Sequence, residues 1–166
     1  MKDLRNIKTI PFEIGQLLAN NTILCGLMLD DSNDPKTIES SFSSLLNNHY
    51  INMYPPTESG DIKDYNKSSY IIILIDTINT NSSSQNISVT GHIYVTTDLN
   101  HILLTNNKNR LLEMSDQVFK TLNGEKLTSS GELRINYISY TIINNFRSAY
   151  RISFEVSDQQ IERTEI

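Results

Sequence analysis

The chain has 166 residues, of which 38% are hydrophobic and 20% are charged, and its formal net charge is −5. This size and composition predict a single globular domain, residues 1–166, that buries roughly two-thirds of the surface of its unfolded chain. The acidic balance argues against a dedicated nucleic-acid binder, because binding to phosphates requires clustered Lys and Arg. No stretch approaches the roughly 18 apolar residues of a membrane span, and the N-terminus lacks the apolar segment of a signal peptide. We expect a soluble protein that enters no membrane and is made in a reducing compartment.

The first third of the chain is expected to be helical. Pro11 suits the first turn of a helix, and the apolar residues of that helix are Phe12, Ile14, Leu17 and Leu18. Polar residues at 19–21 interrupt the pattern before an apolar run at 22–29, so the segment is either two short helices or one kinked helix. Cys25, the single cysteine, lies in this run and is expected to be a small buried hydrophobic residue.

A further helix is predicted at residues 35–47. Asp34 and Pro35 are typical of an N-cap followed by the first helical position. The apolar residues that follow have the spacing of one helix face, and they are Ile38, Phe42, Leu45 and Leu46.

Three segments are predicted to lie outside regular structure. Residues 54–69 combine prolines, a glycine and mixed charges without periodicity, which indicates a long loop or an extended arm. Residues 79–86 are rich in Asn and Ser and indicate a mobile hairpin loop. The charged tail at 157–166 is expected to fray.

Three strands of a β-meander are predicted between these loops and the next helix. The β-branched run at 69–78 predicts a strand that is buried on both faces. Residues 87–97 predict a second strand, in which Gly91 marks a bulge or a close approach of another backbone. Residues 101–105 predict a short third strand.

The most strongly patterned stretch is residues 109–127. Asn109 suits an N-cap, and Asn123-Gly124 suits the end of a helix. The predicted apolar stripe between them consists of Leu111, Met114, Val118 and Leu122. The polar face consists of Glu113, Asp116, Gln117 and Lys120.

A C-terminal β-hairpin is predicted from residues 131–143 and 149–156, joined by the turn-forming residues 144–148. The second strand alternates apolar and polar residues, whereas the alternation of the first changes phase, which indicates a bulge near 137 and 138. The order of elements predicts an α+β fold. Its mostly antiparallel sheet, made of the meander and the hairpin, is covered on one face by helices.

The sequence contains no recognisable metal or catalytic motif. His49, His92 and His101 lack the spacing of a metal site, although distance in sequence leaves assembly in space open. Residues 30–34 resemble the start of a calcium loop, but Pro35 occupies the position of the required glycine, and we expect a solvated turn. There is neither a glycine-rich phosphate loop nor a G-x-S-x-G elbow. We expect no enzymatic activity, no cofactor and no metal.

Basic and aromatic residues are interleaved in the C-terminal hairpin, namely Arg134, Arg147 and Arg151 with Tyr137, Tyr140, Phe146 and Tyr150. Such mixtures occur on nucleic-acid surfaces. On alternating strands they more often place the aromatic residues in the core and the arginines outside. Arg and Tyr are also favoured at protein interfaces, so the exposed part is a candidate subunit contact.

Along its whole length the chain resembles the tail terminator or neck (head–tail joining) proteins of tailed bacteriophages. The stretches that carry the resemblance are "IGQLLANNTILCGLMLDDSNDP", "SYIIILIDTI", "SVTGHIYVTT", residues 110–127 and "YTIINNFRSAYRISFEV". The chain departs from that family in the long polar loop of its meander and in the predicted helix at 35–47. The resemblance implies a tail-terminator-like α+β fold.

The resemblance also implies a function. Such a protein forms a ring of about six or twelve copies at the head–tail junction of a virion assembled in the host cytoplasm. Its partners are portal, connector or tail tube proteins, and DNA passes through the ring without specific binding. Its position is that of a terminator, a neck ring or a portal-proximal adaptor. The alternative hypothesis is a cytosolic, non-enzymatic binding module for a small ligand or peptide.

We expect contacts between subunits at the two polar loops, at the polar face of the predicted helix within residues 109–127 and at the turn of the C-terminal hairpin. The candidate interface residues are Tyr54, Glu58, Asp61, Lys63, Asp64, Ser83, Gln85, Glu113, Asp116, Lys120 and Arg147.

Overall fold

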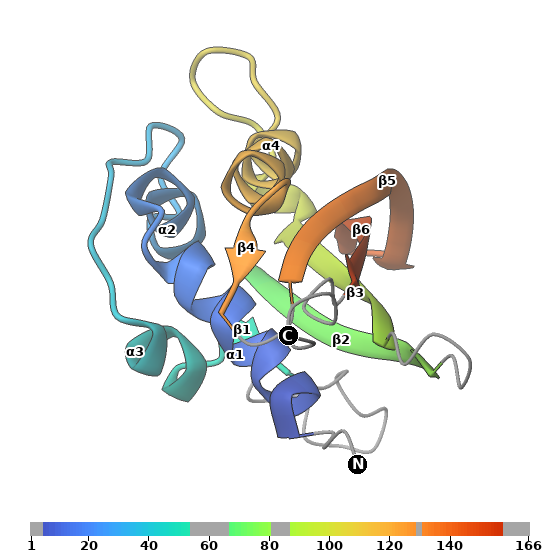
Figure 1. Cartoon of the computed structure of the whole chain (residues 1–166). Helices are drawn as coiled ribbons and strands as arrows, with labels where there is room; N and C mark the ends of the chain where they lie inside the picture. Colours follow the sequence, from blue (N-terminus) through green and yellow to red (C-terminus); the bar gives the residue numbers. More distant parts are fainter. Residues whose placement is uncertain (1–4, 54–66, 81–86, 129–130, 158–166) are drawn as a thin grey trace, which may run out of the picture.

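The computed structural model describes residues 5–53, 67–80, 87–128 and 131–157 (Figure 1). The first half contains helices α1 (Arg5–Ala19), α2 (Thr22–Leu29) and α3 (Phe42–Asn47) and strands β1 (Ile51–Asn52), β2 (Ser69–Thr80) and β3 (Ile87–Asp98). The second half contains the 3-10 helix η2 (Leu99–His101), α4 (Arg110–Leu122), β4 (Lys126–Leu127), β5 (Gly131–Asn144) and β6 (Arg147–Ser157).

The strands form one curled sheet in the order β1-β2-β3-β6-β5-β4. All neighbours are antiparallel except β1 and β2, which are parallel. Helices α1 and α2 pack against β2, whereas α4 packs against β3, β5 and β6 (Figure 1). This arrangement confirms the predicted α+β fold, with a mostly antiparallel sheet covered on one face by helices.

The register of the sheet defines its two faces. Ile73, Ile93 and Ile152 are aligned across β2, β3 and β6, and all three are 0% exposed in the core beneath the helices. Successive residues of a strand point to opposite faces. Leu74 and His92 therefore lie on the other face of the sheet, together with the residue of β6 that pairs with His92.

Helix α1 begins at Arg5, so the prediction that Pro11 lies in its first turn was wrong. A proline inside a helix removes one backbone hydrogen bond. An apolar stripe that starts upstream of Pro11 offsets this loss, since it is buried in the core and consists of Ile7, Ile10, Ile14 and Leu18. Of the two alternatives for this region, the structure has two helices, and Asn21 caps the second by accepting a hydrogen bond from the Leu24 N–H.

The predicted helix at 35–47 was wrong in its first half. Residues 35–41 have no regular secondary structure, and α3 starts only after the N-cap residue Ser41. The cause is a close contact with α2, because a Cβ on Gly26 would lie 2.0 Å from the carbonyl oxygen of Lys36. The Ile38 N–H also donates to the Thr22 carbonyl. These tertiary contacts hold the segment extended along α2.

Two strand predictions also need correction. Residues 101–105 form no strand and contain only an isolated bridge between Leu103 and Asn109. The chain turns earlier, because the Asp98 carboxylate caps η2 by accepting from the Asn100 N–H. In β2, burial on both faces holds for residues 70–73, whereas residues 76–79 are exposed.

Other local predictions are confirmed. A Cβ on Gly91 would lie 2.3 Å from the Leu74 carbonyl oxygen, so this glycine permits a close backbone approach. The associated bulge lies opposite, between Ile75 and Thr77 of β2. Asn109 caps α4, and Gly124 adopts a φ of +86° after it. The register of β5 shifts between residues 135 and 137, next to the predicted position, and Cys25 is buried.

Arg110, the first residue of α4, joins segments that are distant in sequence. Its side chain is 0% exposed, and all its hydrogen bonds go to backbone carbonyls. Nη1 donates to Leu27 at 2.6 Å and to Asp30 at 2.8 Å, both at the C-terminal end of α2. Nη2 donates to Ser32, and Nε donates to His101 at 2.8 Å. One guanidinium therefore fixes α4 against α2 and against η2.

The environment of Arg110 is balanced between desolvation and negative charge. Burial lowers the pKa of the guanidinium, whereas the carboxylates of Asp31 and Asp30 raise it. An arginine remains protonated under such conditions, because its intrinsic pKa is so high. Hydrogen bonds from Ser32, together with one from the Lys36 N–H, lower the pKa of Asp30 and keep that carboxylate ionised beside the guanidinium.

We expect Arg110→Met to lower the free energy of unfolding by about 3–5 kcal/mol, because several buried carbonyls lose their donor. Urea denaturation followed by circular dichroism measures the change. Arg134→Met is the matched control, since Arg134 is exposed and pairs with Glu132 on the surface. Its expected effect is within about 0.5 kcal/mol. Equal losses from the two substitutions would contradict the role given to Arg110.

Candidate functional site

The most prominent surface feature is a group of exposed apolar side chains on β5 and on the turn after it. Ile142 is 69% exposed and Phe146 is 72% exposed. We call the group the hairpin apolar surface, and it consists of Tyr137, Ile138, Tyr140, Ile142, Ile143 and Phe146. Clusters of exposed apolar residues of this kind are rare on monomeric proteins and mark contact surfaces.

The same part of β5 has an open edge. β4 pairs only with the first two residues of β5, and the segment just before β4 reaches no further than Ile135. Among the described residues, the rest of β5 pairs with no strand other than β6. Residues 135–146 contain no charge, no proline and no glycine. Charges, prolines and bulges normally protect an exposed edge strand, and this edge has two bulges but neither charge nor proline, so it has the properties of an interface.

The sheet has a second open edge at β2. β1 pairs only with Ile71 and Ile72, and the described residues provide no other strand on that side of β2. The eight residues that follow, 73–80, therefore have β3 as their one strand neighbour among the described residues. Ile78 and its polar neighbours are exposed there.

The interleaved basic and aromatic residues lie differently from the expected arrangement. Tyr137, Tyr140 and Phe146 are exposed, whereas Arg147 and Arg151 are half-buried. The expectation of aromatic residues in the core was therefore wrong for these three. β5 extends beyond the helices that cover the first part of the hairpin (Figure 1), which leaves Tyr140 on the helix side without cover, whereas Tyr137 pairs with Ser153 on the opposite face. Arg151 lies over the Tyr137 ring, at 5.7 Å from its centroid.

Of the predicted interface residues, those that the structure describes lie on α4 and at the start of β6. Those in the two polar loops, Tyr54, Glu58, Asp61, Lys63, Asp64, Ser83 and Gln85, lie outside the described residues. On α4, Asp116 pairs with Lys120 at 2.5 Å, and Glu113 lies 3.4 Å from Lys108. Arg147 donates to the carbonyls of Ser68 and Lys67, so its guanidinium is bound within the chain.

A row of three polar side chains in contact, which was not predicted from the sequence, crosses three strands. His92 on β3 contacts Ser153 on β6, with 3.0 Å between Nδ1 and Oγ. Its Nε2 lies 3.2 Å from a carboxylate oxygen of Asp76 on β2. The three residues are far apart in sequence, and only the strand register and the bulge in β2 bring them together.

The order of these contacts is that of a Ser–His–Asp hydrolase site, but the surroundings are not. Ser153 is 5% exposed in the middle of β6, where substrate has little access. β6 is paired on both sides, so its backbone N–H groups serve the ladders rather than an oxyanion hole. The geometry favours a structural role, in which these polar contacts hold β2, β3 and β6 together on the face opposite the helices.

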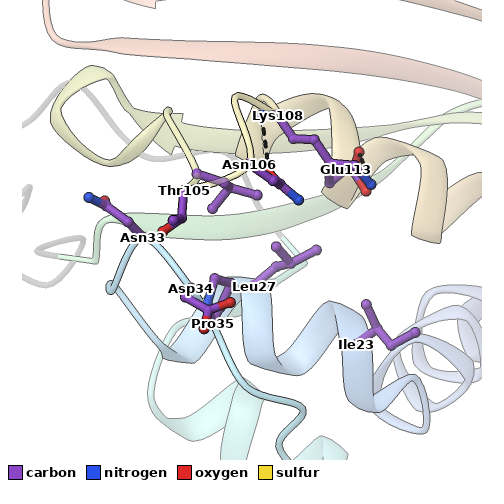
Figure 2. Close-up of a pocket in the computed structure, with 10 residues that line it drawn as sticks. Ile23, Leu27, Asn33, Asp34, Pro35, Thr105, Asn106, Lys108 and Glu113 are labelled. Carbon is purple, nitrogen blue, oxygen red and sulfur yellow. Dashed lines mark hydrogen bonds and ion pairs between the residues drawn. The ribbon is translucent and has the colours of Figure 1, made fainter.

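A groove of about 460 Å³ lies between α2 and the loop before α4 (Figure 2). Ile23 and Leu27 line it from α2, and residues 33–35 line it from the turn that follows. Figure 2 shows the Lys108 side chain reaching toward Glu113 across its upper wall. The groove is of ligand size but combines apolar walls with a paired cation and anion.

Neither a metal-binding cluster nor a membrane-spanning helix occurs in the part of the chain that the structure describes. No group of three or more His, Cys, Asp and Glu side chains converges there in a way that could hold a metal ion. In the same residues, no helix has both the length and the apolar character needed to span a membrane.

Comparison with known proteins gave a likeness of structure but not of sequence. No protein family model and no curated protein sequence matches the chain. Its fold is similar to that of a chain in the virion of the native gene transfer agent (GTA) particle, with a TM-score of 0.55 and 10% sequence identity. The match covers 93% of this chain and 98% of the virion chain. At this identity the likeness concerns the fold.

We expect a fluorophosphonate probe, which reacts with activated serines, to leave Ser153 unmodified, because the hydroxyl is buried and lacks oxyanion donors. Intact-mass and peptide mass spectrometry detect the adduct, and a known serine hydrolase treated in parallel shows that the reagent is active. Labelling of Ser153 that His92→Ala abolishes would contradict the structural role and indicate a catalytic serine.

Proposed function

We propose that the protein is a structural component of a phage-related virion that closes a ring at the head–tail junction. The proposed position is that of a tail terminator, a neck ring or a portal-proximal adaptor. In it, the chain contacts copies of itself and portal, connector or tail tube proteins. DNA passes through the ring without specific binding, and the protein acts mechanically rather than as an enzyme.

The observation that carries this proposal is the match of fold to a virion chain over nearly the whole of both chains. A match of that coverage extends over most of the architecture rather than over one common motif. Fold alone does not imply function, so the proposal needs support from the surface of this chain.

The surface supports an assembly role. The hairpin apolar surface and the two open edges of the sheet are features that a protein working alone would cover or charge. The net charge of −5 fits a ring that lets DNA pass, since like charge keeps a polyanion from adhering. Glu113, Asp116 and Lys120, on the outer side of α4, remain candidate contacts with a neighbouring protein.

A second candidate function is that of a cytosolic binding module for a small ligand or peptide. The groove beside α2 favours it by its volume and by its apolar residues Leu27 and Leu104. This function predicts a monomer or dimer that is stabilised by a ligand. A thermal-shift screen reports such a ligand, and Leu27→Ala should then weaken its binding.

We expect the full chain to form rings of about six or twelve copies, alone at high concentration or after mixing with portal-bearing heads of the same virus. Negative-stain electron microscopy shows the rings, and native mass spectrometry counts their subunits. Monomers alone under both conditions would contradict the proposed function.

A further inference from the structure

We infer that neighbouring subunits pair through their sheet edges, with the open edge of β5 in one copy bonded to the open edge of β2 in the next. This inference rests on the proposed ring and names the contact that closes it. The partner of the hairpin apolar surface is then a second copy of this chain.

The two edges match in length and availability. β5 offers the residues after Ile135, up to Asn144, and β2 offers residues 73–80. In the described part of the chain, these are the two long strands that have a strand neighbour on only one side over most of their length. The other terminal strands, β1 and β4, have two residues each. A pairing between β5 and β2 thus satisfies the backbone groups of both long edges.

Strand direction favours a head-to-tail contact. β2 is antiparallel to β3, β3 to β6, and β6 to β5, so β2 and β5 run in opposite directions. Rotation about a ring axis preserves the direction of each strand relative to that axis. The β2 of the next copy therefore meets β5 antiparallel, and the alternation of strands continues from one subunit into the next.

The alternative of β5 against β5 of a second copy differs in its consequence. Such a contact is two-fold symmetric, and it closes a dimer in which both β2 edges stay open. The contact between β5 and β2 joins two different surfaces, so each copy binds two neighbours. Head-to-tail contacts of this kind generate rings when the rotation closes.

The side chains of the two edges are compatible. The β5 segment at 135–146 is uncharged, and residues 73–80 of β2 carry one charge, on Asp76, whose carboxylate already lies beside His92. No like charges oppose each other across the contact. Exposed Ile78 of β2 provides an apolar partner for Ile138 and Ile142 of β5, which are also exposed on the helix side of their strand.

The register provides a test by cross-linking. Thr77 and Asn79 of β2 pair with Thr90 and Ser88 of β3, on the face away from the helices. Ser139 and Thr141 of β5 pair with residues of β6 on that same face. Cysteines at these four positions would point the same way across an extended sheet, and a β2 and a β5 cysteine that lie directly opposite each other would have a separation that suits a disulfide. The native Cys25 is buried and does not compete.

In the experiment, each full-length variant, Thr77→Cys, Asn79→Cys, Ser139→Cys or Thr141→Cys, is oxidised alone and then mixed with each of the others. We expect disulfide-linked dimers when a β2 variant is mixed with a β5 variant. Peptide mass spectrometry identifies the linked pair. Dimers formed by Thr141→Cys or Ser139→Cys alone would show the two-fold contact and overturn the inference.

A second measurement uses a charge at the edge. Ile142→Lys should reduce the fraction of protein in rings at least tenfold, because it places a cation in the apolar contact. Leu103→Lys is the matched control, since Leu103 is 67% exposed but lies in the loop before α4, away from both edges. It should leave ring formation unchanged, and circular dichroism should show both variants folded.

The outcomes separate the inference from the proposed function. Rings that form without any mixed disulfide, and that Ile142→Lys leaves intact, overturn the edge pairing while the ring function stands. A lack of rings and of disulfides at every concentration tested, with or without portal-bearing heads, overturns both. Mixed disulfides together with loss of rings in Ile142→Lys support both.

Discussion

The guanidinium of Arg110 holds the helix layer together, and the position of α4 on the sheet depends on it. Its hydrogen bonds reach carbonyls at the end of α2, in the turn after α2 and in η2. These carbonyls lie in segments where a regular helix or sheet does not supply backbone donors. The one guanidinium supplies several donors in their place. With α4 fixed in this way, its apolar stripe covers the first part of the C-terminal hairpin and leaves the second part bare.

The two halves of the hairpin therefore have different roles, because one half forms core and the other provides an exposed contact surface. The half beneath α4 contributes Leu133, Phe154 and Val156 to the core. The other half contributes little to the core and retains apolar side chains with an open backbone edge. The polar contacts of Asp76, His92 and Ser153 lie on the opposite face and link the open edge strand β2 to β6 across β3.

Local sequence patterns were sufficient to predict those elements whose structure depends mainly on their own residues. Helix α4, its caps and the strands of the C-terminal hairpin followed from spacing, from Asn109 and from Gly124. The patterns failed where tertiary contact decides, as in residues 35–41, which lie extended because Gly26 lets their backbone approach α2. Pro11 was misplaced because the buried stripe of α1 begins before it.

The candidate contact surface was harder to predict for a related reason. Alternation in β5 and β6 indicated which residues share a face, but not how far the covering helix extends along that face. The aromatic residues of β5 therefore looked like core residues. The absence of charge from 135 to 146 was visible in the sequence and is the signal that would have identified the open edge. The cross-strand contact of His92 depends on register and left no signal in the sequence.

The close approach at Gly91 has a geometric consequence for an assembly built edge to edge. There, the bulge in β2 faces a residue without a side chain, and bulges increase the local twist and bend of a strand. The rotation from one subunit to the next would combine the turn of the sheet from β2 to β5 with the turn across the contact between β5 and the next β2. A turn of about 60° closes six subunits, and one of about 30° closes twelve. The diameter of the central channel would then depend on the curvature of the individual sheet.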